Sequence, residues 1–298
     1  MEVILETLLL FRTIFSKVEV TENVAEKFDY AQIIQLSPLD DELRMMGYVI
    51  VTNLGKVIVV DGGLYTDGPK LERYINEYGG KVDSWFITHF HADHTGAFDY
   101  VVNNTSIEVE NVYTSLNSRE NVEKYELIRL DDYDRYVKTL KNPKLEGKVH
   151  DVKIGQIIKT GNITSEILSV KNEEFTNNYG NNQSVVIKMK IGSSSMIFLG
   201  DTGLEEEEFL INNYSAQKLK ADYVQMSHHG QKGASEKLYS IISPKYCFWP
   251  CSIKLYDNNM GNGFNTASFK TVETRRWVEK LGVINYVAGY GDIKLQIK

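Results

Sequence analysis

The chain has 298 residues, of which 42% are hydrophobic and 24% are charged, and its formal net charge is −7. A chain of this length and composition is expected to bury a large core as an ordinary globular protein. The negative balance, without a long basic run, argues against tight nonspecific binding to nucleic acid, because such binding needs clustered Lys and Arg.

Residues 1–25 are expected to form an amphipathic segment that packs on the domain or on a second copy of the chain, as a homo-oligomer. Apolar residues recur from Val3 to Phe15, but Glu2 and Glu6 stand where a signal peptide would carry basic residues. The stretch is too short and too charged to be a transmembrane segment. The absence of a visible signal peptide favours the cytoplasm, or an extracellular location if a leader has been removed.

Residues 26–298 are expected to form a single domain, because no low-complexity segment or Pro/Gly/Ser-rich linker divides them. Strand-like runs are predicted at 31–36, 47–52, 56–60, 84–88, 112–115, 149–154, 163–170, 184–191, 195–199, 222–226, 246–249, 283–287 and 292–297. Helix-like runs are predicted at 68–77, 96–102, 119–140, 205–213, 235–242 and 267–281. This alternation, with several strands in direct succession, favours an α/β fold of two mixed sheets covered by helices.

Three histidines and an aspartate fall between His89 and His94, in a chain with only six histidines. This mixture of nitrogen and oxygen ligands suits borderline-soft cations such as zinc. His89 and His91 point to the same side of an extended chain, so they can bind one ion together. Asp93 and His94 begin the next helix and point toward a second metal position. Alternatively, Asp93 is a helix N-cap and His94 a histidine bonded to the backbone.

The pattern His-x-His-x-Asp-His resembles the signature of the metallo-β-lactamase-fold superfamily, and the resemblance covers about residues 30–298. A strand ending in Asp61 precedes the motif, a later strand ends at Asp201, and a third leads to His228 and His229. The resemblance implies a four-layer αββα sandwich whose metal ligands come from loops at one end of the sheets.

The resemblance also implies six metal ligands: His89 and His91 for one ion, Asp93, His94 and His228 for the other, and Asp201 as the bridge. His229 is expected to contact substrate, although it could exchange roles with His228. Asp61 is expected to orient a ligand histidine, unless it only forms a turn. Asp201 could likewise be a turn residue in Gly-Asp-Thr-Gly.

The expected cofactors are two divalent cations, Zn²⁺ in the first place, with Mn²⁺ or Fe as alternatives. Cations roughly 3.5–4 Å apart lower the pKa of a bridging water from about 15.7 to near 7, so hydroxide is available at neutral pH. The same cations stabilise the oxygen on which negative charge develops. The sequence therefore predicts a metal-dependent hydrolase of esters, amides, thioesters or phosphodiesters, with Asp93, Asp201 and His229 as catalytic residues.

Many members of the superfamily carry a further metal histidine before the bridging aspartate, and this chain has none suitable, since His150 comes too early. An Asn-Asn-x-Ser turn at 181–184 takes its place. With His-His-Gly, it resembles the metallo-hydrolase domain of bacterial competence (DNA-uptake) channel proteins and the teichoic-acid phosphorylcholine esterases. The resemblance implies a zinc phosphodiesterase acting on a small-molecule or cell-wall-type phosphodiester.

Four side chains are predicted to bind such a substrate. Asn182 and Ser184 are neutral donors suited to phosphate oxygens, and Asn182 could itself be a weak metal ligand. Lys232 and Ser235 stand at a helix N-terminus, which favours phosphate. A tight turn before a strand and an ordinary helix cap explain these residues equally well.

Two other classes of function stay open. One is a hydrolase of another ester, thioester, lactone or β-lactam, and the other is a non-catalytic metal-binding module. The predicted helix 119–140 is expected to be exposed with a seam of tyrosines against the core, although tyrosines over an acidic face could also receive a cation such as choline. Cys247 and Cys251 are expected to be buried thiols, and a disulfide stays possible, so the redox compartment is undetermined.

Overall fold

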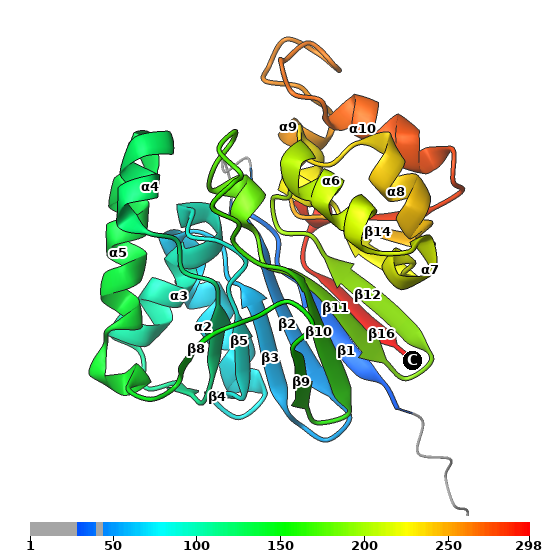
Figure 1. The fold of residues 1–298 in the computed structure, drawn as a ribbon. Coiled ribbons are helices and arrows are strands. Elements are labelled where there is room, and N and C mark those ends of the chain that lie inside the picture. The colour runs from blue at the N-terminus through cyan, green and yellow to red at the C-terminus, as the bar shows by residue number, and fades with distance from the viewer. Residues whose placement is uncertain (1–28, 40–43) are drawn as a thin grey trace, which may run out of the picture.

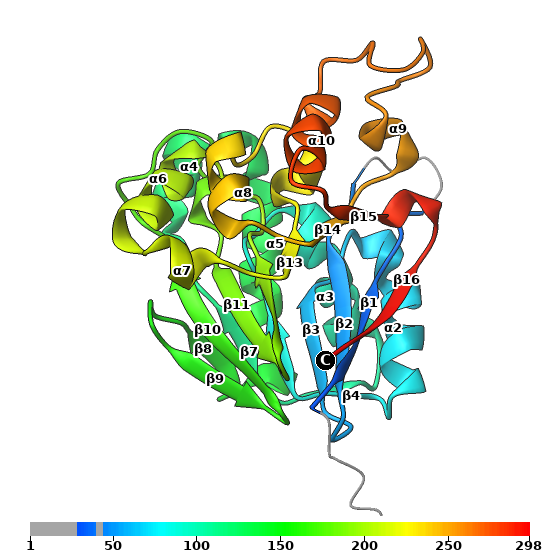
Figure 2. The same ribbon diagram turned by 90° about the vertical axis from the view of Figure 1, so that its right-hand side faces the viewer.

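The computed structural model describes residues 29–39 and 44–298, so the expected N-terminal amphipathic segment lies outside the described residues. Two seven-stranded sheets face each other, and helices cover their outer faces (Figure 1). A view turned by 90° shows the strands in the lower part of the molecule, with most of the helices above and behind them (Figure 2). The expected αββα sandwich is therefore confirmed.

The first sheet has the strand order β16-β1-β2-β3-β5-β7-β8. Its strands are β1 (Ala31–Gln35), β2 (Gly47–Thr52), β3 (Val57–Asp61), β5 (Ser84–Phe86), β7 (Val112–Thr114), β8 (Val149–Asp151) and β16 (Ile293–Ile297). The pairs from β16 to β3 are antiparallel, and those from β3 to β8 are parallel. On its outer face lie α2 (Gly68–Glu77), α3 (Ala92–Asn104), α4 (Arg119–Tyr125) and α5 (Leu130–Leu140).

The second sheet has the order β15-β14-β13-β12-β11-β10-β9. Its strands are β9 (Ile157–Thr160), β10 (Ile163–Ser169), β11 (Val186–Ile191), β12 (Ser194–Phe198), β13 (Tyr223–Gln225), β14 (Tyr246–Trp249) and β15 (Ile284–Val287). The strands from β9 to β12 pair antiparallel and those from β12 to β15 parallel. Its outer face is covered by α6 (Leu204–Asn213), α7 (Ala216–Leu219), α8 (Glu236–Ile242), α9 (Ile253–Tyr256) and α10 (Thr271–Glu279). A separate pair joins β4 (Lys81–Val82) and β6 (Glu108–Val109).

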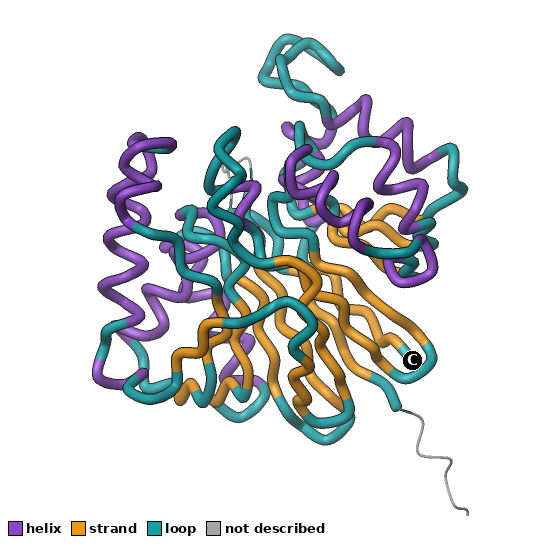
Figure 3. Tube along the Cα trace, viewed as in Figure 1, coloured by secondary structure: helices purple, strands orange, loops and turns teal. Residues whose placement is uncertain are grey.

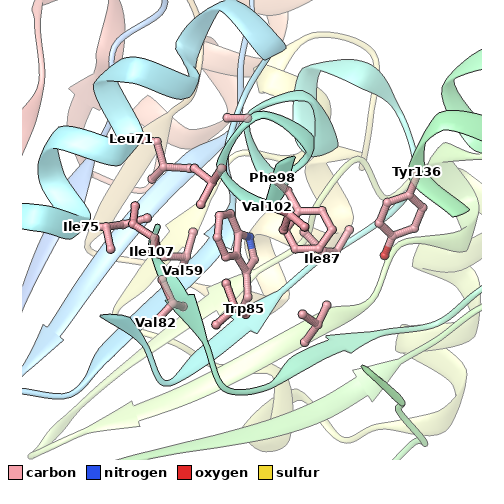
Figure 4. Packing of buried hydrophobic residues seen from close by; sticks show 14 of the residues in the cluster. Val59, Leu71, Ile75, Val82, Trp85, Ile87, Phe98, Val102, Ile107 and Tyr136 are labelled. Atoms are coloured by element: carbon pink, nitrogen blue, oxygen red, sulfur yellow. The ribbon is translucent and has the colours of Figure 1, made fainter. Parts of the chain in front are cut away.

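The strands lie in the middle of the molecule with helices on both sides (Figure 3). Three hydrophobic layers hold the sandwich together, one between the sheets and one under each set of helices. Every residue of β3 is buried, because successive side chains point to opposite faces and both faces are covered. Val59 packs under the helices, whereas Val60 packs between the sheets. Figure 4 shows Val59 in the outer layer with Trp85, whose ring lies 4.9 Å from that of Phe98.

The predicted helix at 119–140 is wrong in one respect, because the structure divides it into α4 and α5. Glu126 leaves the helical conformation, with φ −148 and ψ 48, and a short 3-10 helix at Leu127–Arg129 follows. The carboxylate of Glu126 accepts a hydrogen bond from the backbone N–H of Gly180, which is distant in the sequence. No local sequence pattern predicts this contact. The expected tyrosine seam is present, since Tyr133 and Tyr136 are buried in the core.

The elements that sequence patterns missed are short ones: β4, β6, β9, α7 and α9, each with two to four residues. Periodicity needs more residues than these to be recognisable. None of the helices in residues 29–39 and 44–298 combines the length and the apolar character that crossing a bilayer demands. The division between a segment at 1–25 and one domain at 26–298 stays a prediction.

Candidate metal centre

The candidate ligands follow the carboxyl ends of strands from both sheets. In the first sheet, Asp61 ends β3, and the segment after β5 carries His89 and His91 before α3 begins. In the second sheet, Asp201 follows β12, and the short 3-10 helix Ser227–Gly230 follows β13. Because parallel strands end at the same edge of a sheet, these segments meet at one place.

Asp201 lies at the centre of the arrangement. Its Oδ1 is 3.2 Å from His94 Nε2. Its Oδ2 is 3.9 Å from His89 Nε2, 3.8 Å from His228 Nε2 and 3.6 Å from His229 Nε2. The side chains that the first motif and the later His-His pair contribute therefore converge on one carboxylate, as expected of a bridging ligand.

Two groups of side chains have the geometry to hold an ion. One consists of His89, His94 and Asp201, and the other of Asp93, His94 and His229. In each group the candidate ligand atoms lie within 4.8 Å of one another, and every member is buried.

Four atoms of these groups are buried without a hydrogen-bond partner among the described residues: His89 Nε2, His94 Nε2, His229 Nε2 and Asp201 Oδ1. An unsatisfied buried polar atom costs about 1–3 kcal/mol, so such a concentration of them is expensive for the apoprotein. Divalent cations held by the two groups would satisfy these atoms, and imidazole nitrogens with carboxylate oxygens are ligands that such cations accept. The residues present therefore fit a metal centre.

Three of the histidines have their other ring nitrogen held by an oxygen of the protein. His94 Nδ1 lies 2.7 Å from Asp61 Oδ2, and His89 Nδ1 lies 3.1 Å from Thr88 Oγ1. His229 Nδ1 lies 2.9 Å from the Pro250 carbonyl oxygen, which can only accept. The Thr88 hydroxyl gives its own proton to Asp61, so it accepts from His89. In the neutral form of each ring, Nδ1 therefore carries the proton, and Nε2 keeps the lone pair toward the ions.

Asp61 is itself fixed from several sides. Its carboxylate accepts hydrogen bonds of 2.7 Å from both the backbone N–H and the hydroxyl of Thr88. The residue is fully buried and adopts φ 53, in the left-handed region that few non-glycine residues occupy. The geometry fits the expected role of Asp61 as the residue that orients a ligand histidine, here His94.

Burial and nearby charges shift the pKa values of several residues of the centre in opposite directions. Burial lowers the pKa of His89 well below its usual value, which leaves the ring neutral. Burial also acts to lower the pKa of His94, but the carboxylates of Asp201 and Asp61 outweigh it and raise that pKa well above the usual value. For the Asp201 carboxyl, burial acts to raise the pKa, and the imidazoles of His94 and His229 lower it well below its usual range. A cation would therefore compete with a proton for the His94 ring.

The sequence favoured His228 as the ligand and left an exchange with His229 open, and the structure places His229 in one of the two groups. His229 is fully buried, and its Nε2 lies 3.3 Å from Asp93 Oδ2. The His228 side chain is 19% exposed, its Nδ1 donates to the Lys232 carbonyl at 2.9 Å, and its Nε2 lies 3.4 Å from Asn181 Nδ2. The geometry thus favours His229 as a ligand and leaves His228 at the rim of the centre.

His91 stands apart from both groups. Its ring centroid is 4.5 Å from that of His89, but its Nε2 lies 3.0 Å from Glu126 Oε1. Sequence patterns did not single out Glu126 for this place, because it lies 35 residues away in the chain.

Three of the side chains predicted to bind substrate have structural hydrogen bonds. Ser184 is fully buried and its hydroxyl accepts the Asp201 N–H at 3.0 Å. Asn182 accepts from the Glu206 N–H at 3.2 Å and donates to the Asn177 carbonyl at 2.7 Å. Ser235 caps α8 through the Lys237 N–H at 3.2 Å. These bonds match the alternative interpretations, a tight turn before a strand and a helix cap.

Arg44 is a neighbour of the centre that the sequence did not reveal. Its Nε lies 2.7 Å from Asp93 Oδ2, and its side chain is 31% exposed. Burial acts to raise the pKa of the Asp93 carboxyl, but the surrounding histidines and the Arg44 guanidinium lower it well below its usual range. The contact joins residues 49 positions apart, so no local signal could have found it.

A cavity of about 600 Å³ opens beside His228. Its lining includes Lys232, Leu204 and Trp277, together with three asparagines of the turn after β10. The cavity therefore borders the centre on the side of the more exposed histidine.

Comparison with known proteins gives the family. The profile of the Metallo-beta-lactamase superfamily matches residues 47–243. The chain is 25% identical over 167 residues to ComE operon protein 3 of Bacillus subtilis (strain 168), a match that spans 55% of this chain and 19% of that protein. Most of that relative's length therefore has no counterpart here.

Two solved structures show the fold alone, because their sequence identities are low. The metallo-beta-lactamase fold protein YhfI from Bacillus subtilis aligns with a TM-score of 0.54 at 13% identity, over 90% of this chain and 100% of that one. CmlA, a diiron beta-hydroxylase from Streptomyces venezuelae, aligns with a TM-score of 0.51 at 11% identity, over 91% of this chain and 54% of that one. From the profile match and the His/Asp groups at the strand ends, the chain belongs to the metallo-beta-lactamase superfamily of metal-dependent hydrolases.

Proposed function

We propose that this chain is a phosphodiesterase that uses two divalent cations, with zinc as the first candidate. The observation that carries the proposal is the convergence of three unpartnered imidazole nitrogens and one unpartnered carboxylate oxygen around Asp201. Bound cations supply Lewis-acid activation of water and neutralise the charge that develops on a phosphoryl oxygen.

The residues of the chain divide into those that hold the ions and those that orient them. We assign the members of the two groups as ligands, namely His89, Asp93, His94, Asp201 and His229, which exchanges His229 for His228 in the set expected from the sequence. We keep His91 as the sixth ligand from the sequence expectation, although it belongs to neither group. Asp61 and Thr88 fix the rings of their histidine neighbours, and Arg44 holds the Asp93 carboxylate.

The substrate class follows from the charges on the rim. Among the described residues, the cavity lining carries two lysines, Lys232 and Lys270, and two glutamates, Glu205 and Glu273. Lys270 pairs with Glu273 at 3.3 Å and Glu205 accepts hydrogen bonds from Asn177, whereas Lys232 has no ion pair and its side chain is exposed. An exposed ammonium beside the cations favours an anionic substrate over a neutral ester. His228 Nε2 faces both the centre and the cavity, so we assign it a contact with a phosphate oxygen or the leaving group.

The direct test is hydrolysis of bis(p-nitrophenyl) phosphate by protein loaded with zinc, manganese or cobalt. Asp93→Ala is expected to lower kcat/KM by about 100-fold or more, a loss comparable to removing one electrostatic stabiliser of a transition state. Asp131→Ala provides the matched control, because Asp131 is exposed in the first turn of α5.

The same assay, extended to carboxylic esters, thioesters, lactones and a β-lactam, separates the alternatives. Turnover of one of these without turnover of the phosphodiester would replace the proposed substrate class. Full metal loading without turnover of any substrate would favour a non-catalytic metal-binding module instead.

A further inference from the structure

The Glu126 carboxylate contacts a ring nitrogen of His91, as other oxygens contact ring nitrogens of the candidate ligand histidines. The three histidines discussed above each have one ring nitrogen held by a carboxylate, a hydroxyl or a backbone carbonyl. For His91 the corresponding contact is between Nε2 and Glu126 Oε1, at 3.0 Å. Their side chains are 6% and 15% exposed, so solvent screens this contact only partly.

The donor and acceptor roles in this contact follow from the chemistry of the two groups. An ionised carboxylate only accepts hydrogen bonds, so the proton of a neutral His91 ring lies on Nε2. Nδ1 is then the nitrogen that keeps a lone pair. His91 therefore offers the opposite ring nitrogen from His89 and His94, which keep their lone pairs on Nε2.

The second carboxylate oxygen of Glu126 contacts the segment that stands where many members of the superfamily have a further metal histidine. Glu126 Oε2 accepts the backbone N–H of Gly180 at 2.7 Å, next to the Asn-Asn-x-Ser turn. A Cβ at position 180 would lie 2.5 Å from Glu126 Oε2 and 2.5 Å from His91 Nε2. Real Cβ atoms do not approach so closely, so the contact depends on glycine here.

We infer that Glu126 is a positioning residue of the metal centre, which fixes His91 with Nδ1 available to an ion and holds the Asn-rich turn against it. The break between α4 and α5 falls at this residue, whose backbone leaves the helical conformation. The inference rests on the metal centre and is independent of the proposed phosphodiester substrate.

The test compares Glu126→Ala and Glu126→Gln with Glu123→Ala. Glu123 belongs to the same helix, but its side chain is 57% exposed and contacts only Arg119, at 3.4 Å, among the described residues. Zinc stoichiometry is measured by elemental analysis, and affinity by competition with a chromophoric chelator. Glu126→Ala is expected to lower the affinity for one of the two ions by about 10–100-fold, as is usual when a residue that hydrogen-bonds a metal ligand is lost. Glu123→Ala is expected to match the wild type.

A second measurement separates positioning from a merely structural role. Long-range ¹H–¹⁵N NMR of the metal-free protein is expected to show His91 protonated on Nε2 in the wild type and as a mixture of tautomers in Glu126→Gln. Thermal melts identify any variant that fails to fold. If Glu126→Ala fails to fold, the comparison uses the isosteric Glu126→Gln variant. Wild-type affinity for both ions and an unchanged His91 tautomer in folded Glu126 variants would overturn the inference. Neither readout requires a substrate, so failure of the phosphodiesterase proposal leaves this test intact.

Discussion

His228 and His229 are neighbours in sequence but serve different sides of the centre, because both adopt the left-handed backbone conformation. Their φ angles are 49 and 57, within a 3-10 helix that carries non-helical geometry. Such a conformation costs an L residue roughly 1–2 kcal/mol. The hydrogen bonds to the Pro250 and Lys232 carbonyls hold the two rings apart, one toward the ions and one toward the cavity. Strain of this kind is typical of functional sites.

The two single alanine variants of this pair distinguish their roles. His229→Ala is expected to lose one of the two ions, because His229 Nε2 lies close to both Asp93 and Asp201. His228→Ala is expected to keep both ions and to lower kcat/KM on the phosphodiester by about 10–100-fold, the size of a lost general acid or polar contact. Elemental analysis and steady-state kinetics of the two variants provide the measurement. If His228→Ala loses the ion and His229→Ala keeps it, the assignment reverts to that expected from the sequence.

At the scale of secondary structure, α3 carries Asp93 and His94 into the centre on its first turn and depends on close packing at Gly96. A Cβ at position 96 would lie 2.2 Å from the backbone nitrogen of Tyr65 and 2.6 Å from the Leu64 carbonyl carbon. These are backbone atoms, so they cannot move aside as the end of a flexible side chain could. The helix that carries two candidate ligands is therefore placed by contact of one main chain with another.

Gly96→Ala is expected to lower the free energy of unfolding by about 1–3 kcal/mol or more, since overpacking forces backbone shifts. Because α3 must move to accept the methyl group, the affinity for metal is expected to fall as well. Chemical denaturation and chelator competition measure the two effects. Ser240→Ala, at an exposed position of α8, is the control and is expected to be nearly neutral. Unchanged stability and metal affinity in Gly96→Ala would contradict this account of the packing.

Long elements with strong patterns were predictable from the sequence, and contacts between distant segments were not. The predicted strand at 47–52 and helix at 68–77 coincide with β2 and α2, because their apolar spacing reflects which face is buried. The contact between Glu126 and Gly180 joins positions 54 apart, so local periodicity contains no trace of it. The first metal motif was visible because its ligands are neighbours in the chain. The choice between His228 and His229 depends on backbone geometry that sequence does not record.

On the scale of the whole molecule, the metal centre joins the two sheets. Asp61 and the first histidine motif follow strands of the first sheet, whereas Asp201 and His229 follow strands of the second. An ion bound between them would link the ends of β3 and β12, the strands at which each sheet changes from antiparallel to parallel pairing. Removal of the ions is therefore expected to destabilise the fold as well as to stop the reaction, because binding to the folded state alone adds about 2.7 kcal/mol at 100 times Kd.

In the metal-free protein the charges of the centre make stability depend on pH in two opposite ways. The raised pKa of His94 contributes stability that is fully present below its unfolded value of about 6.5 and is lost as pH rises through the folded value. The lowered pKa values of Asp93 and Asp201 contribute stability that is present above about 3.9 and is lost as pH falls through their folded values. His89 and His228, whose pKa values burial lowers, cost stability below about 6.5, and this cost disappears as pH rises through that value. Of these groups, His94 is the one that keeps changing stability at higher pH.

Cations compete with the proton on His94, so the stabilisation by metal is expected to grow as pH rises from about 6 toward the folded pKa of His94. Thermal denaturation with and without a chelator, repeated across that range at constant ionic strength, measures the difference in Tm. The chelated protein is expected to lose stability with rising pH, while the zinc-loaded protein keeps it. His150→Ala is a suitable control, because His150 contacts Asn111 in the first sheet and not the centre. A difference in Tm that stays constant with pH would show that no proton leaves the centre when the metal binds.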